Sequence, residues 1–217
     1  MSYVYSLTLI SLWLLLVIST SLIYSKKFPK EKELSRKIVH IGTGPVIPLA
    51  WWLNIPTYIA GPIAICITIA LIINYKFRII GSIENIERKS FGTIAYGISI
   101  STLIAFLWSD YPSAVTAGVL CMSFGDGFAG MIGQRVKSLQ WSILGQTKSL
   151  GGTLAMAISV GIVLSIINQI IGVELNFLNV IEVTSLAVIL EQISPLGIDN
   201  ITVPLGVALS WQWLLSS

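Results

Sequence analysis

Asp126 stands out because it is a carboxylate inside an otherwise uncharged, apolar stretch. It belongs to the segment 123–135, SFGDGFAGMIGQR, where it lies between two glycines. A carboxylate in the middle of a membrane helix costs about 2.5–3.5 kcal/mol, so it needs a partner, a metal ion or water. Helix packing through small residues would account for Gly130 and Gly133, but not for an Asp between two glycines. We therefore expect Asp126 to bind a metal ion or to act at a phosphate site.

A second polar segment, residues 144–153 (LGQTKSLGGT), comes directly before an apolar stretch and contains Lys148, Ser149 and Gly152. Free backbone N–H groups at a helix start, together with an ammonium group, are a phosphate-binding combination. The pattern GxxxxGK[ST] is absent, which excludes a Walker-type NTPase. A plain loop with a helix cap is the alternative interpretation.

A third polar segment, residues 191–204 (EQISPLGIDNITVP), has a Pro and a Gly that break a helix. Asp199 and Asn200 then offer oxygen ligands, and Glu191 lies deeper in the preceding stretch. Mg²⁺ takes such ligands and keeps water and substrate phosphates in its coordination sphere. We expect Asp126, Asp199 and Glu191 to hold a divalent cation; a turn between two helices is the alternative for this segment.

Basic residues precede two other apolar stretches. Arg36 and His40 are four residues apart, so they share one helical face beside Lys37. His40 would lie just inside a membrane, where an ionisable group is usually functional, although a structural histidine is the alternative. Arg88 and Lys89 could neutralise phosphates or simply anchor a helix.

The amino-acid composition indicates that these polar residues belong to a membrane protein. Of 217 residues, 54% are hydrophobic and 11% are charged, and the mean hydropathy is +0.84. Soluble domains carry roughly 25% charged residues, so a soluble globular enzyme is not expected. The net charge of +3 is too weak to indicate a nucleic-acid partner. Two cysteines without CxxC spacing and one histidine exclude a disulfide framework, a Cys-based zinc site and a histidine metal cluster.

A helix needs about 20 apolar residues to cross a bilayer. The sequence predicts an all-α, polytopic integral membrane helical bundle with about seven or eight transmembrane helices. The first lacks a basic n-region and an A-x-A site, so we interpret it as a retained helix rather than a signal peptide. The predicted spans are 2–25, two within 38–75 separated by a turn at 54–56, 90–109, 112–133, 149–173, 176–195 and 200–216.

The basic residues test this topology. All 13 Lys and Arg fall in the first, third and fifth loops, which share one side of the membrane if the span count is right. The positive-inside rule makes that side cytoplasmic and places both termini on the other side. Every polar segment described above then lies at the cytoplasmic face.

That inventory suits phosphoryl transfer from a soluble nucleotide to a lipid alcohol. The donor would come from the cytosol and the acceptor laterally from the bilayer, and a carboxylate would take or orient the hydroxyl proton. The candidate catalytic residues are Asp126, Lys148, Asp199 and His40. Periodicity alone does not say which carboxylate receives the proton.

Five blocks in order resemble the CTP-dependent prenol kinases: RKIVHIGTG, ERKSFGT, SFGDGFAGMIGQR, KSLGGT and EQISPLGIDNITVP. The match is closest to the phytol kinase branch and more distant to dolichol kinase and CTP-dependent diacylglycerol kinase. The resemblance implies transfer of the terminal phosphate of CTP to phytol with a divalent metal such as Mg²⁺, giving phytyl phosphate and CDP. In photosynthetic organisms this reaction salvages phytol for tocopherol and chlorophyll synthesis.

The resemblance also implies site residues. The blocks from Gly125 to Gln134 and from Lys148 to Thr153 would form the CTP site, and Asp199 and Asn200 match the second acidic block. Relatives often carry an acidic residue after the Lys-Ser pair, whereas this chain has Leu150-Gly151-Gly152. The residues expected to bind the nucleotide are Arg36, Lys37, Arg88, Lys89, Gly125, Gly127, Gln134, Ser149, Gly152 and Asn200.

The predicted organisation is one integral membrane kinase domain over 1–217. Residues 1–35 hold the first span and a basic loop, 36–204 the motif-bearing core, and 205–217 the end of the last span. No plastid transit peptide is seen, so a cyanobacterial cell or thylakoid membrane is the expected location.

Three alternatives stay open. The first is a kinase for farnesol, geranylgeraniol, dolichol or diacylglycerol, and the second is a cytidylyltransferase that releases pyrophosphate. The third is a small transporter that uses Asp126 as a proton or cation site. Transporters often contain internal repeats, and none is found. The polar residues also cluster at one face instead of following a path across the membrane, which favours an enzyme.

Overall fold

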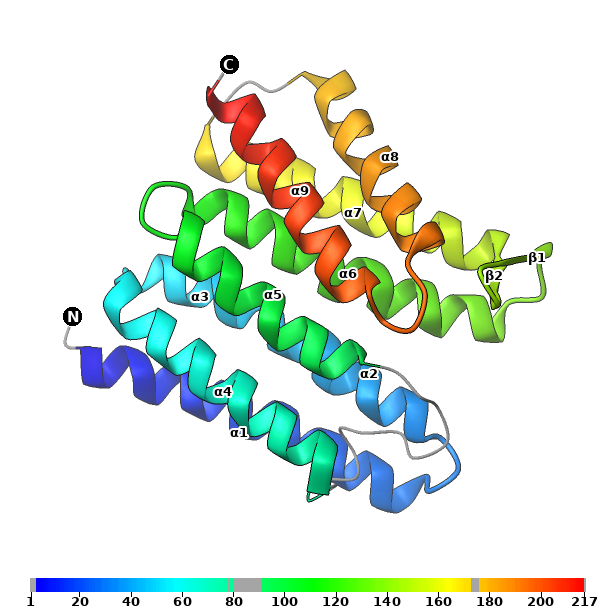
Figure 1. Ribbon diagram of the computed structural model, residues 1–217, viewed down its shortest axis with the longest axis horizontal. Coiled ribbons are helices and arrows are strands. Elements are labelled where there is room, and N and C mark those ends of the chain that lie inside the picture. The colour runs from blue at the N-terminus through cyan, green and yellow to red at the C-terminus, as the bar shows by residue number, and fades with distance from the viewer. Residues whose placement is uncertain (1–2, 78, 80–90, 173–175, 217) are drawn as a thin grey trace.

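The computed structural model describes residues 3–77, 79, 91–172 and 176–216, which form nine α-helices and one β-hairpin (Figure 1). The elements are α1 (Tyr3–Lys27), α2 (Lys32–Thr43), α3 (Val46–Trp52), α4 (Thr57–Phe77), α5 (Gly92–Leu107), α6 (Pro112–Arg135), β1 (Gln140–Ile143), β2 (Gln146–Ser149), α7 (Leu150–Ile171), α8 (Phe177–Ile193) and α9 (Asp199–Ser216).

The prediction of an all-α membrane bundle is confirmed. Every predicted span contains a helix, but the second is broken into α2 and α3 at Gly44-Pro45. Four of the described helices are long and apolar enough to cross a membrane, namely α1, α4, α6 and α7. The others are shorter or less apolar, so the count of seven or eight spans stays a prediction.

Helix α6 lies at the centre of the bundle and packs against α7, α9, α2, α3 and α5. Its first half is built from small residues and is almost completely buried, from Ser113 to Val119. A Cβ added at Gly118 would lie 2.4 Å from the carbonyl oxygen of Pro204 in α9, so the two backbones touch there. This close packing fixes the position of α6, which carries Asp126 in its C-terminal half, relative to α9.

The hairpin of β1 and β2 was not predicted. Its strands pair antiparallel through a two-residue turn at Leu144-Gly145, where both residues have positive φ (49° and 76°). Positive φ at both positions is the type I′ geometry that matches strand twist. The available sequence signals were the Leu144-Gly145 dipeptide and the polar–apolar alternation of Gln140–Ile143. Four residues are too few to indicate a strand, and Gln146–Ser149 is polar throughout.

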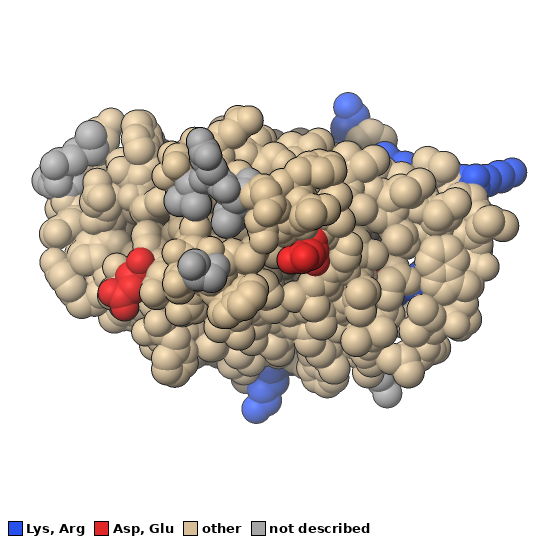
Figure 2. All heavy atoms as spheres, turned by 90° about the horizontal axis from the view of Figure 1, so that it is seen from above, with Lys and Arg blue, Asp and Glu red and all other residues tan. Residues whose placement is uncertain are grey.

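The polar elements gather at one end of the bundle. Figure 1 shows the start of α2, the end of α6, the hairpin, the end of α8 and the start of α9 together at the right. In contrast, the face seen in Figure 2 carries few charged side chains over a broad uncharged surface. Such a surface suits contact with lipid, and the functional groups are confined to the polar end.

Candidate active site

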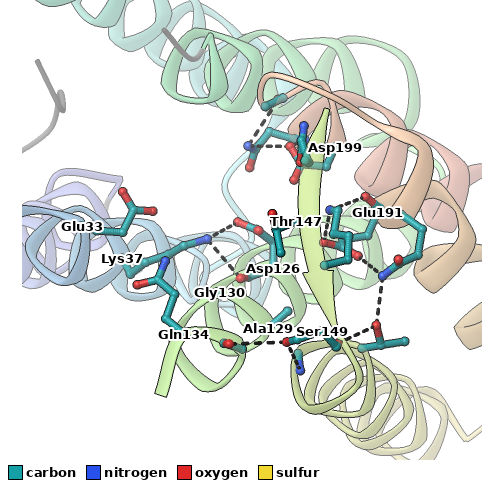
Figure 3. A pocket seen from close by; sticks show the side chains of 18 of the residues that line it. Glu33, Lys37, Asp126, Ala129, Gly130, Gln134, Thr147, Ser149, Glu191 and Asp199 are labelled. Carbon is teal, nitrogen blue, oxygen red and sulfur yellow. Dashed lines mark hydrogen bonds and ion pairs between the residues drawn. The ribbon is translucent and has the colours of Figure 1, made fainter. Parts of the chain in front are cut away.

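A cavity of about 330 Å³ opens at the polar end, within the range of about 300–1,000 Å³ that is usual for small-molecule sites. Side chains from seven elements line it, and Figure 3 shows them converging. Ten residues predicted from the sequence are among them: Arg36, Lys37, Asp126, Gln134, Lys148, Ser149, Gly152, Glu191, Asp199 and Asn200. Arg88 and Lys89 lie outside the described residues.

Asp126 projects from α6 toward Lys37 of α2, and the two form a buried ion pair. Lys37 Nζ lies 2.6 Å from Asp126 Oδ2 and also donates to the Asp126 carbonyl oxygen at 3.0 Å (Figure 3). Lys37 is only 5% exposed. The pair supplies the partner that a carboxylate in an apolar helix requires.

His40 lies behind this pair rather than in the cavity. Its Nε2 is 3.3 Å from Asp126 Oδ2, and its ring contacts the ring of Tyr96 with centroids 4.8 Å apart. His40 Nε2 is buried without a hydrogen bond, and His40 is not one of the described residues that line the cavity. His40 therefore contacts the Asp126 carboxylate from outside the cavity, and its part in catalysis stays a prediction.

Two glycines of α6 let α2 approach Asp126. A Cβ at Gly127 would lie 2.3 Å from Cγ1 of Ile41, and a Cβ at Gly130 would lie 2.9 Å from Cε of Lys37. The Lys37 side chain thus runs along a groove that exists because residue 130 has no side chain. Close approach through glycine is the packing role expected of small residues in membrane helices.

Two further glycines allow α7 to pack closely against the other side of α6. A Cβ at Gly125 would lie 2.5 Å from the sulfur of Met156, and a Cβ at Gly133 would lie 2.9 Å from Oγ of Ser149. Gly125 and Gly127 are in contact with neighbouring helices and are not among the described residues that line the cavity, and their contact with a nucleotide stays a prediction. Their effect is to bring α2 and α7 to either side of Asp126.

A second buried ion pair joins the hairpin to α8. Lys148 Nζ of β2 lies 2.5 Å from Glu191 Oε1 and 2.8 Å from the Glu191 carbonyl oxygen. Gln192 Nε2 donates to the other carboxylate oxygen of Glu191 at 2.8 Å. Glu191 is therefore engaged by two protein groups.

The start of α7 does not present the free N–H groups that the sequence suggested. Gly151 N donates to Ser138 Oγ at 3.0 Å, and Gly152 N donates to Ser149 Oγ at 3.2 Å. These serines satisfy the first-turn donors that an anion would otherwise bind. The alternative of a capped helix start is correct for these amides, and Lys148 remains the phosphate-binding candidate of this segment.

Asp199 and Asn200 begin α9 at the cavity wall. Among the described residues Asp199 has no salt bridge, and Asn200 Oδ1 is buried without a hydrogen-bond partner. Asp199 lies outside the four candidate spans, and burial, reinforced by the nearby Asp126 carboxylate, raises the pKa of Asp199 to about 7. Negative charge at this position is therefore undercompensated, which suits a bound cation.

The three carboxylates expected to hold a metal do not form one cluster. No three His, Cys, Asp or Glu side chains within the described part of the chain are grouped closely enough to hold a metal ion. Lysines already occupy Asp126 and Glu191, which leaves Asp199 with Asn200 as the candidate ligands. Since Mg²⁺ is usually bound by one or two carboxylates together with substrate phosphates, this smaller set fits it.

Several cavity residues were not expected from the sequence. Glu33 lies 2.6 Å from Nη2 of Arg36, and Arg36 Nε is buried without a hydrogen bond. Gln140, Gln146 and Gln192 also line the cavity, because the hairpin and the end of α8 close one side of it. Isolated glutamines in a short polar segment carry no distinctive sequence signal.

Comparison with known proteins gives three similar chains. The phytol kinase of Synechocystis sp. is 36% identical over 190 residues, which covers 84% of this chain and 82% of that protein. A probable chloroplastic phytol kinase 2 of Glycine max is 29% identical over 202 residues, and a probable chloroplastic phytol kinase of Zea mays is 27% identical over 211 residues. This chain spans 67% and 68% of those two plant proteins, respectively. No family model matches the chain, and no solved structure matches it significantly.

Proposed function

This chain belongs to the phytol kinase family, and from that premise we propose that it transfers the terminal phosphate of CTP to the hydroxyl group of phytol. The products are phytyl phosphate and CDP. The observation that carries the proposal is the cavity at the end of the apolar helices, where cations, carboxylates and a buried amide oxygen converge. The reaction would return free phytol to tocopherol and chlorophyll synthesis.

The nucleotide phosphates would lie among Arg36, Lys37 and Lys148. Each of these cations is paired with a carboxylate, so each is already held at the cavity wall. The cavity is lined by four carboxylates and three cations, which leaves an excess of one negative charge. A triphosphate therefore needs an accompanying cation to bind there.

Asp199 and Asn200 would hold that cation, which we propose to be Mg²⁺. Support comes from the buried, partnerless Oδ1 of Asn200 and from the lack of a salt bridge to Asp199 within the described residues. A divalent ion bound here neutralises charge that develops on the phosphates. Gly197 O and Asp199 Oδ1 both lie within hydrogen-bond distance of Asn200 Nδ2, which turns the amide oxygen away from them.

Asp126 would orient the phytol hydroxyl for attack. The alcohol oxygen forms a bond to the terminal phosphorus, the bond from that phosphorus to the bridging oxygen breaks, and CDP leaves. The alcohol proton passes to the Asp126 carboxylate, which Lys37 and His40 hold in place. Because phosphoryl transfer has a loose transition state, orientation of the hydroxyl contributes more than strong basicity.

The proposed enzyme is a multi-pass membrane protein with its cavity at the cytoplasmic face of a cell or thylakoid membrane. The described basic side chains lie toward the polar end, including Lys26, Lys76 and Arg135 in the last turns of α1, α4 and α6. Lys and Arg accumulate on the cytoplasmic side of membrane proteins. Phytol would reach the cavity from the bilayer, and CTP from the cytoplasm.

The test uses the purified protein in detergent with Mg²⁺, γ-labelled CTP and phytol. Label should appear in phytyl phosphate, and Asp126→Asn should lower this activity by at least about a hundredfold, as expected when a group that positions the reacting atoms is lost. Asp110→Asn is the matched control, because Asp110 is exposed between α5 and α6.

Other outcomes would point elsewhere. Preference for farnesol, geranylgeraniol, dolichol or diacylglycerol would replace phytol as the acceptor. Pyrophosphate release with a CDP-lipid product would identify a cytidylyltransferase. An Asp126→Asn variant with full activity would remove Asp126 from the mechanism.

A further inference from the structure

One face of the hairpin is fixed against the end of α8. Trp141 and Lys148 are cross-strand partners, and Gln146 lies two residues before Lys148 on the same face of β2. Lys148 reaches α8 through its ion pair, and Trp141 Nε1 donates to Gln192 Oε1 at 3.1 Å. Gln146 Nε2 donates to the carbonyl oxygen of Ser194 at 3.3 Å.

This last contact fixes the orientation of the Gln146 amide. A backbone carbonyl can only accept, so the NH₂ group of Gln146 must face Ser194 and Oε1 must be at the other end of the amide. Gln146 lines the cavity, and its Oε1 has no hydrogen-bond partner among the described residues. Gln146 therefore provides a hydrogen-bond acceptor at the cavity, because the contact with Ser194 decides which end of its amide carries the oxygen.

The other glutamines of the cavity differ in this respect. Gln192 uses both ends of its amide, since Oε1 accepts from Trp141 and Nε2 donates to Thr153 Oγ1 at 3.0 Å. The amide of Gln140 has no partner in the described structure, so it can turn to present either a donor or an acceptor. Gln146 combines a fixed amide with a free acceptor.

We infer that Gln146 determines which nucleotide base the enzyme accepts, by accepting a hydrogen bond from an exocyclic amine. This inference rests on the proposed function and adds to it a residue that selects the donor. Cytosine carries such an amine, whereas uracil carries a carbonyl oxygen at the same place, so Gln146 Oε1 would face a second acceptor. Lys148 is two residues along the strand, about 7 Å away, on the side where the phosphates would lie.

The test measures kcat/KM with CTP and with UTP, at saturating phytol, for the full chain and for Gln146→Leu. The substitution removes the acceptor and the contact with Ser194 while keeping an extended side chain. The preference for CTP over UTP should fall by about ten- to a hundredfold, the effect expected for one hydrogen bond in a partly buried site. Gln140→Leu, on the same hairpin, should leave the preference within about threefold, because its amide is not oriented.

A second variant covers the case in which Gln146→Leu does not fold. Gln146→Glu loses the donor to Ser194 and adds a negative charge, so kcat/KM should fall with both nucleotides, but it keeps an acceptor at this position and should therefore retain the preference for CTP. Equal preference in wild type and Gln146→Leu, or loss of preference in Gln140→Leu alone, would overturn the inference. Failure of the wild type to phosphorylate phytol with either nucleotide would instead contradict the proposed function.

Discussion

We expect Gly130→Ala to lower catalytic activity strongly while destabilising the helix bundle only modestly. A Cβ at Gly130 would lie 2.9 Å from Cε and 3.1 Å from Nζ of Lys37. Both distances are shorter than a comfortable contact, so the lysine must move. Its end is flexible, and the backbone of α2 can stay in place while Nζ shifts away from Asp126.

The cost can be bounded from the contacts that would be lost. Lys37 Nζ donates to two oxygens of Asp126 at 2.6 and 3.0 Å, and removing one partner of a buried ion pair altogether costs about 3–5 kcal/mol. Here the lysine is displaced and not removed, so the cost should be that of overpacking, about 1–3 kcal/mol, less the gain of about 0.5–1 kcal/mol that alanine brings to a helix interior. Since Asp126 loses its positioning partner, kcat should fall by about ten- to a hundredfold at unchanged expression and membrane insertion.

The assay is phytyl phosphate formation, paired with thermal unfolding of the purified protein in detergent. Gly61→Ala is the matched control, because Gly61 is inside α4 and a Cβ there would meet nothing within 4 Å. That change should leave activity intact and stabilise the helix by about 0.5–1 kcal/mol. Wild-type kcat in Gly130→Ala, with Gly61→Ala behaving as expected, would refute the idea that the position of Lys37 controls the site.

Two further predictions concern the other charged groups. Lys148→Met should lower the free energy of unfolding by about 3–5 kcal/mol because Glu191 is left buried without its cation, and adding Glu191→Gln should restore stability but not activity in the same unfolding and kinase assays. Restored activity in the double variant would show that Lys148 serves only the fold. Asp199→Asn should raise the Mg²⁺ concentration for half-maximal activity by at least about tenfold, and Asp110→Asn should not; an unchanged Mg²⁺ dependence would exclude Asp199 as a ligand.

Hydropathy predicted the helices because the cost of exposing backbone in lipid leaves few other structures possible. The same reasoning located Asp126, since a carboxylate in an apolar stretch needs compensation. Its partner could not be predicted in the same way: Lys37 is 89 residues away, and the pairing depends on how α2 packs against α6. The sequence showed a basic residue near one helix start and an acidic residue in another helix, but nothing that joined them.

The glycines around Asp126 show a second limit. The family resemblance implied that Gly125 and Gly127 bind a nucleotide, yet in the structure the four glycines of this segment pack on two faces of one helix. Gly127 and Gly130 face α2, and Gly125 and Gly133 face α7. The sequence alone does not distinguish a glycine that contacts a ligand from one that contacts a helix, because the distinction depends on which element packs against it. The same applies to the amides at the start of α7, which are satisfied by Ser149 at its N-cap and by Ser138, which precedes the hairpin.

The ion pairs in the cavity explain how the empty site can be stable and how it could still bind the triphosphate of the proposed nucleotide. An isolated lysine or carboxylate at this depth would destabilise the bundle, so Lys37 and Lys148 are held by Asp126 and Glu191. Phosphate oxygens can share these ammonium groups without requiring them to move far. Asp199 has no such partner among the described residues, and in the proposed function its charge would be neutralised by a bound cation. On the proposed function, the nucleotide and its metal ion would bind as one unit, and neither should bind tightly without the other.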